Sequence, residues 1–415
     1  MQPHTATHRP GQPEQRAVRR LRPLRVALTF SGVAPWVPVE KVFMTQLGFT
    51  PGLVALMAAA YAAVVPVLEI PSGLLADRWS RRGVLMMAEG AALVSVVIGA
   101  LSHSVGTYVV SAMVLGAYFA LSSGTVDAIV YDVLVEESVD SERFEHVYGR
   151  MQLWGSAALT ASALAGGLVA ALLSPRATYV VTVPFVLLGI VVLGGFREPT
   201  VHRSATSRSI RAHLAETAAA LRGPGLLAPV IGSVAAAAAL QMVFEFGPLW
   251  LVALHAPAAL FGVFTAAVTA TLGLGAALAA RLHLGRRPSA VAALVLMTGG
   301  VLLVARGGLV EVVAGQIVMA LLLVAMGVHF SRLVHDAVAS SLRSGVSSGV
   351  GTLSWVVFLP CALIFGGLSS GSGLRGGAIV LGGLVLVAGL AVVLTADPRP
   401  AARAVPEAAP VLVGG

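Results

Sequence analysis

The sequence predicts an all-α integral membrane protein, with about twelve transmembrane helices arranged as two six-helix bundles. Of its 415 residues, 57% are hydrophobic and only 11% are charged, whereas a soluble domain carries about 25% charged residues. The mean hydropathy is +0.88. Apolar runs long enough to cross about 30 Å of hydrocarbon recur at short intervals, and the basic residues fall in the short loops between them.

The expected spans follow these apolar runs along the chain. The first run is interrupted by two prolines and by the pair Glu40–Lys41. This predicts a broken helix that faces protein or a watery cavity, because backbone exposed to lipid must be hydrogen-bonded within its own helix. The expected spans are 23–47, 52–76, 84–102, 106–135, 148–173, 177–196, 226–252, 258–281, 289–305, 309–335, 346–368 and 376–395.

The distribution of basic residues predicts the topology. With the N-terminus in the cytoplasm, the 27 Lys and Arg residues lie on cytoplasmic segments, except Arg176, Arg306, Arg375 and Lys41. This is the positive-inside pattern of a protein with both termini in the cytoplasm, and the plasma membrane is the expected location. The net charge of +8 therefore reflects contact with the lipid bilayer, and no nucleic-acid partner is expected.

The chain is expected to divide into five segments. A basic, disordered cytoplasmic tail precedes an N-terminal bundle, and an amphipathic cytoplasmic linker joins it to a C-terminal bundle and a second cytoplasmic tail. A degenerate repeat, GLLADRWSRR after the second span and GAALAARLHLGRR after the eighth, supports two related halves. The boundaries are 1–22, 23–196, 197–225, 226–395 and 396–415.

A charged motif joins the second and third spans. Residues 69–82 read EIPSGLLADRWSRR, which closely resembles the signature loop of the major facilitator superfamily: a glycine, then Asp-Arg, then a basic pair. Ser80 stands where that pattern has a further glycine. The resemblance implies two bundles around a central substrate site that is exposed alternately to the two sides of the membrane.

The resemblance implies a conformational gating role for this motif. A glycine lets two helices approach closely, and Asp77 at a span end can accept from the amides of a neighbouring helix N-terminus. Positive-inside topology alone would explain the arginines, but it would not explain Gly73 and Asp77. The expected gating residues are Gly73, Asp77, Arg78, Arg81, Arg82 and, on the fourth span, Asp132.

The fourth span carries two acidic positions. Residues 122–132, SSGTVDAIVYD, resemble a stretch found in a bacterial, multidrug-exporter-like branch of the superfamily. Asp127 and Tyr131 share a helix face, and a carboxylate in hydrocarbon costs about 2.5–3.5 kcal/mol, so Asp127 is expected to face protein or water. Asp132 lies nearer the inner surface, where a structural salt bridge with a loop arginine is the favoured reading.

Polar residues on helix faces predict a substrate or proton cavity. Gln241, Phe244 and Glu245 fall at positions i, i+3 and i+4 of the seventh span. No basic residue lies near Glu245 in the sequence, so we expect it to be a protonatable carboxylate without a local cation; a structural, hydrogen-bonded glutamic acid is the alternative. The other expected cavity residues are Asp127, Glu69, Trp36, Glu40, Tyr131 and Gln152.

Two departures from the superfamily's proton-coupled exporters bear on the mechanism. Ala112 lies where those exporters carry a span-four arginine, and Ser162-Ala163 replaces the Gly-Pro pair ahead of the double glycine in span five. The antiporter hallmark is therefore missing, although Gly166 and Gly167 keep the capacity for close packing.

These features predict a secondary active transporter that exports an apolar or amphipathic compound, with protons as a candidate coupling ion. The sequence has no GxxxxGK[ST] loop, no metal-spaced His/Cys cluster and no nucleophile elbow, so no cofactor, no metal and no enzymatic activity are expected. A monomer is expected. Uptake of a nutrient is the alternative, ahead of a non-transporting receptor or scaffold and a membrane enzyme.

Overall fold

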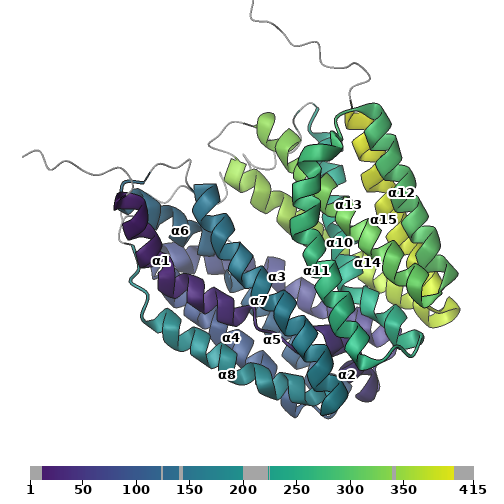
Figure 1. Ribbon diagram of the computed structural model, residues 1–415, viewed down its shortest axis with the longest axis horizontal. Helices are drawn as coiled ribbons and strands as arrows, with labels where there is room; N and C mark the ends of the chain where they lie inside the picture. The colour runs from purple at the N-terminus through teal and green to yellow at the C-terminus, as the bar shows by residue number, and fades with distance from the viewer. Residues whose placement is uncertain are drawn as a thin grey trace, which may run out of the picture.

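The computed structural model describes residues 12–122, 125–139, 144–199, 223, 225–338 and 343–396. These residues form helices joined by short connections (Figure 1). The helices are α1 (Gln12–Ser31), η1 (Val37–Val39), α2 (Glu40–Gln46), α3 (Pro51–Arg78), α4 (Arg81–Leu101), α5 (Val105–Ser122), α6 (Thr125–Glu136), α7 (Phe144–Leu172), α8 (Pro175–Gly194), α10 (Leu227–Ala253), α11 (Ala258–Leu282), α12 (Arg287–Arg306), α13 (Leu309–Asp336), α14 (Arg343–Ser372) and α15 (Leu374–Thr395).

The helices confirm the predicted all-α membrane fold. Among the described residues, 11 segments are long and apolar enough to cross a membrane, with α5 and α6 counted as one. The predicted first span is not among them. Its residues belong partly to α1, which is rich in arginine, and partly to η1 and α2, which are short. Together these elements make a multi-pass membrane protein, with 11 candidate spans where twelve were predicted.

The break in the first span follows from its sequence. Pro35 and Pro38 cannot donate the backbone hydrogen bonds of a continuous helix. The backbone amide of Ala34, at the break, donates instead to the Ser162 hydroxyl on α7, at 3.1 Å. A neighbouring side chain thus satisfies backbone that would otherwise be unpaired at membrane depth.

The N-terminal tail is shorter than the sequence predicted. The prediction that residues 1–22 form a disordered tail is wrong for 12–22, which belong to α1; residues 1–11 lie outside the described part of the chain. Leu21 and Leu24 are buried on one face of α1, and Arg20 on another pairs with Glu136 at 3.0 Å and Glu137 at 3.2 Å. This segment is an amphipathic helix whose many arginines made it resemble a disordered basic tail in the sequence.

Two bundles build the molecule, α1–α8 and α10–α15 (purple to teal, and green to yellow, in Figure 1). The connection expected at 197–225 lies mostly outside the described residues. We call the side where α1 begins and α15 ends the tail face, and the side where α2 ends and α3 begins the far face. The bundles meet where α7 packs on α11 and where α3 packs on α14.

Small residues allow the bundles to meet in the half of the molecule toward the far face. A Cβ atom added at Gly262 of α11 would lie 2.6 Å from the Ala163 carbonyl oxygen on α7, too close for any side chain. A Cβ atom added at Gly52 of α3 would lie 2.8 Å from the Ser370 hydroxyl on α14. Toward the tail face α7 and α11 diverge (Figure 1). The bundles are therefore closed against each other at the far face.

Candidate functional site

A cavity of about 550 Å³ lies where the two bundles face each other. Most of its wall comes from the N-terminal bundle, and α10 and α14 of the C-terminal bundle complete it. Apolar and aromatic side chains make up most of the lining. The charged and amide-bearing residues of the lining are Glu40, Lys41, Glu89, Gln152, Gln241 and Glu245.

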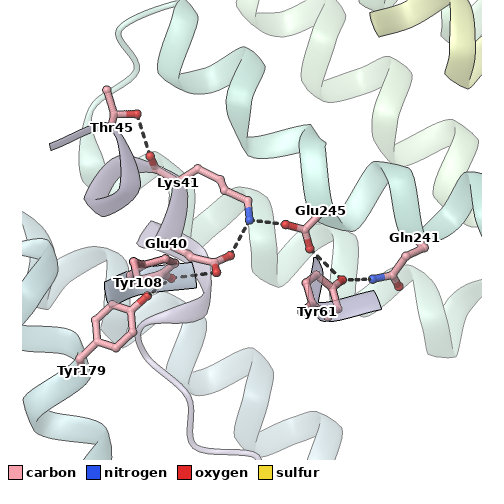
Figure 2. A network of polar contacts seen from close by, with 8 residues as sticks. All are labelled: Glu40, Lys41, Thr45, Tyr61, Tyr108, Tyr179, Gln241 and Glu245. Atoms are coloured by element: carbon pink, nitrogen blue, oxygen red, sulfur yellow. Dashed lines mark hydrogen bonds and ion pairs between the residues drawn. The ribbon is translucent and has the colours of Figure 1, made fainter. Parts of the chain in front are cut away.

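Lys41 is the centre of a polar network that joins the two bundles (Figure 2). Its Nζ atom donates to Glu40 Oε2 at 2.7 Å and forms an ion pair with Oε1 of Glu245 on α10. The side chain of Lys41 is only 2% exposed. A buried ammonium is tolerated because two carboxylates accept its hydrogen bonds.

The network continues on the Glu245 side through neutral groups. The Tyr61 hydroxyl on α3 donates to Glu245 Oε2 at 3.1 Å, and Gln241, one turn before Glu245, donates to the Tyr61 hydroxyl at 2.9 Å. The predicted pairing of Gln241 and Glu245 on one face of the seventh span is thus present in the structure. Both residues contact Tyr61 of the opposite bundle.

On the other side, tyrosines hold Glu40. The Tyr108 hydroxyl on α5 donates to Glu40 Oε1 at 2.9 Å, and the hydroxyls of Tyr108 and Tyr179 lie 2.6 Å apart. Trp36 stacks on Tyr179 with 5.3 Å between ring centroids. Tyr108 and Tyr179 lie in the first turns of α5 and α8, so these rings lie on the far-face side of Glu40.

The expectation that Glu245 has no local cation is wrong. Its partner, Lys41, lies 204 residues away in the sequence, and the folding of the broken first span against α10 brings the two together. The sequence did hold a signal: Lys41 and Glu245 are opposite charges inside apolar spans, and such residues commonly pair with each other.

Glu89 is a cavity residue that the sequence analysis missed. It lies on α4, is 2% exposed and lines the cavity. Its Oε1 accepts from the Ser31 hydroxyl at 2.7 Å, while Oε2 has no hydrogen-bond partner among the described residues. The available signal was a single carboxylate inside an otherwise apolar span.

The structure brings together six of the residues predicted for the cavity and separates three. Glu69 lies outside the lining and accepts from Thr352 of α14 at 3.0 Å. Asp127 and Tyr131 are exposed because α6 turns their shared face away from the cavity. Asp127 accepts from the Tyr148 hydroxyl at 3.0 Å. The six that line the cavity are Trp36, Glu40, Gln152, Gln241, Phe244 and Glu245.

The gating motif holds the start of α4 against its neighbours. Arg81 forms an ion pair with Asp132 on α6, the contact expected from the sequence, and donates to the Ala128 carbonyl at 3.1 Å. Arg82 donates to the Gly194 carbonyl at the end of α8. The surroundings of Gly73 and the side chains of Asp77 and Arg78 lie outside what the structure describes, so the gating role of these residues stays a prediction.

Two bundles of membrane-crossing helices around a central cavity, with a charged network that joins the bundles, are the architecture of a membrane transporter. The model of the Major Facilitator Superfamily matches residues 26–282. The chain therefore belongs to this superfamily, which points to a transporter and not to an enzyme.

Solved structures with the same fold include several transporters. Nucleoside transporter NupG, in a mutant form, has a TM-score of 0.76 at 13% identity, over 92% of this chain and 100% of that one. A D-xylose–proton symporter has a TM-score of 0.70 at 15% identity, over 92% and 98%. A bacterial homologue of the human lysosomal transporter Spinster gives 0.69 at 13%, over 92% and 96%. Among curated proteins, none matches the sequence.

Proposed function

We propose that this chain is a secondary active transporter of the plasma membrane that exports an apolar or amphipathic small molecule by alternating access, working as a monomer. The observation that carries this proposal is the lining of the central cavity. Apolar and aromatic groups such as Trp36, Phe244 and Trp355 form most of it, whereas a sugar site needs many hydrogen-bonding side chains.

The charge of the lining favours a cation among amphipathic compounds. Three glutamates, Glu40, Glu89 and Glu245, face the cavity against the single Lys41, so the lining carries excess negative charge when the carboxylates are ionised. Aromatic rings beside carboxylates also attract organic cations through their faces. An amphipathic cation therefore matches both the apolar wall and its charge.

The Lys41–Glu245 ion pair links substrate binding to the change between closed and open states of the far face. It joins α2 to α10 in the state that is closed at the far face, and the pair must separate when the bundles part on that side. A transported cation beside Glu245 would compete with Lys41 for that carboxylate. Binding of the cation would then favour the far-open state. The size of the shift is set by how much more tightly the far-open state binds the cation than the far-closed state does.

Transport of ethidium, a fluorescent amphipathic cation, tests the proposal. Purified protein is reconstituted into liposomes, a pH gradient is imposed, and ethidium movement is compared with that in empty liposomes. We expect transport by the parent and by Ser104→Ala, an exposed far-face position, and roughly tenfold slower transport by Glu245→Gln, within the range of a coupling contact. Equal ethidium movement with and without the protein contradicts this proposal.

Uptake of a polar nutrient is the second candidate, because the structural relatives include nucleoside and D-xylose transporters. The amides of Gln152 and Gln241 in the lining are the groups that would bind hydroxyls or a nucleobase. Radiolabelled uridine and D-xylose in the same liposomes decide between the two. Accumulation of either, with no ethidium transport, favours uptake.

A further inference from the structure

The acidic residues of the cavity occupy two separate sites. Glu245 lies 18 residues after the start of α10, about 27 Å along the helix from the tail face. Glu89 lies eight residues after the start of α4, about 12 Å from the same face. Glu89 is hydrogen-bonded to Ser31, which is not a member of the network around Lys41, so Glu89 needs an explanation of its own.

In the part of the chain that the structure describes, no cation compensates Glu89. Ser31 on α1 is its hydrogen-bond partner, Thr182 and Val186 of α8 line the same cavity, and Tyr118 on α5 is the titratable group within electrostatic range. Among the described residues no basic side chain forms an ion pair with Glu89. A buried ionised carboxylate with one free oxygen is costly, and protonation removes the cost.

The Ser31 hydroxyl is placed to respond to a proton on Glu89. Its Oγ lies 2.7 Å from Glu89 Oε1 and 3.0 Å from the Ala27 carbonyl oxygen. Since a hydroxyl has one hydrogen, it can donate to an ionised Glu89, or donate to Ala27 and accept from a protonated one. Ser31 is the last residue of α1, so this exchange occurs next to the break in the first span.

We propose that Glu89 is a proton-binding site of the cavity, separate from the Lys41–Glu245 pair, and that it takes up and releases the coupling proton. An O–H bond forms on the carboxylate when hydronium in the cavity gives up a proton and leaves water, and the reverse step releases it. The coupling role rests on the proposed transport function; proton binding by Glu89 does not.

Infrared spectroscopy of the purified, lipid-reconstituted protein without substrate tests proton binding. We expect a carboxylic-acid carbonyl band near neutral pH that disappears as pH rises. Glu89→Gln should remove this band, while Glu245→Gln, which removes an ion-paired carboxylate, and Glu311→Gln, at the start of α13, should leave it. A band unchanged in Glu89→Gln overturns the proposal. If that variant does not fold, Glu89→Asp must shift the band, and an unshifted band overturns it equally.

Ethidium transport in liposomes tests the coupling role. For each protein the rate of ethidium transport with a pH gradient is divided by the rate without one. In Glu89→Gln this ratio should fall roughly tenfold or more below that of the parent, as expected of an essential proton carrier. A parent-like response to the gradient overturns the coupling role. If the parent moves no ethidium, uridine or D-xylose while the infrared band still depends on Glu89, the transport proposal fails and the proton site stands.

Discussion

The ammonium of Lys41 on α2 contacts the carboxylate of Glu245 on α10, and this ion pair joins the two bundles inside the membrane. Glu40 is the second carboxylate on the same ammonium, at 2.7 Å. One cation thus contacts two carboxylates that come from different bundles. Glu40 lies on the same bundle as Lys41, whereas Glu245 lies on the other, so the Lys41–Glu245 contact requires the two bundles to meet at this point.

Lys41→Met should destabilise the protein more than Glu245→Gln does. Loss of the lysine leaves Glu40 and Glu245 buried without a cation, and removal of one partner of a buried pair costs about 3–5 kcal/mol. Glu245→Gln leaves Lys41 paired with Glu40 and keeps an acceptor for Tyr61, so its cost should be smaller. Thermal unfolding of the purified variants measures the order.

The double variant Lys41→Met/Glu245→Gln provides the control, because it leaves one buried carboxylate where Lys41→Met leaves two. It should unfold at a higher temperature than Lys41→Met alone. A Lys41→Met protein as stable as the parent would show that Lys41 does not stabilise the buried carboxylates of Glu40 and Glu245.

Gly262→Ala should hinder closure of the far face. Its Cβ atom would meet the Ala163 carbonyl of α7, and overpacking of this kind costs about 1–3 kcal/mol, or roughly a 5- to 150-fold shift in the closing equilibrium. Gly273→Ala, on the same helix with open space around it, is the matched control. Transport rates of both variants at equal expression measure the effect, and equal rates would exclude a role for this contact.

Asp77 and Asp132 should behave differently when neutralised. Asp77→Asn is expected to slow transport in a folded, inserted protein, since the motif implies a helix-end contact made in one state only. Asp132→Asn breaks the ion pair with Arg81 and should reduce stability by about 1.5–3 kcal/mol, as for a hydrogen bond to a charged group. Unfolding temperatures and transport rates, measured together, separate the two roles, and a parent-like rate for Asp77→Asn would remove the gating role.

The connection between the bundles should lie in the cytoplasm. In a Cys361→Ser background, Ile210→Cys is expected to react with a membrane-impermeant maleimide only after the membrane is opened, and Ser104→Cys, on the far face, is expected to react in intact cells. Reaction of Ile210→Cys in intact cells would reverse the topology.

Much of the fold can be predicted from hydrophobicity, because a helix that crosses the lipid bilayer needs an apolar run of roughly constant length. The expected span 258–281 corresponds to α11, and the prolines near residue 35 correctly indicated a broken first span. Residues 12–22 were misassigned because a composition rich in arginine hides the buried face of α1. The local sequence was sufficient to predict α11 and the break in the first span. The helical periodicity of the apolar residues in 12–22 would also have predicted α1.

The site could be predicted only in part. Helix periodicity placed Gln241 and Glu245 on one face, but it could not give the rotation of α10 relative to α2, and the pair Lys41–Glu245 depends on that rotation. The same limit applies to Asp127, whose face is turned out of the cavity. Glu89 was identifiable as a carboxylate in an apolar run. That no basic side chain among the described residues pairs with it follows only from the packing of α1, α4, α5 and α8.

Accessibility of the cavity tests the central claim, that the bundles expose one cavity alternately to the two sides and that Lys41–Glu245 holds the far face closed. Ser156 lines the cavity, so Ser156→Cys in the Cys361→Ser background reports access of an impermeant maleimide in right-side-out and inside-out vesicles. We predict labelling mainly from the cytoplasmic side in the parent background, and additional labelling from the outside when Glu245→Gln is introduced. The same one-sided labelling with and without Glu245→Gln, or none from either side, would contradict the account.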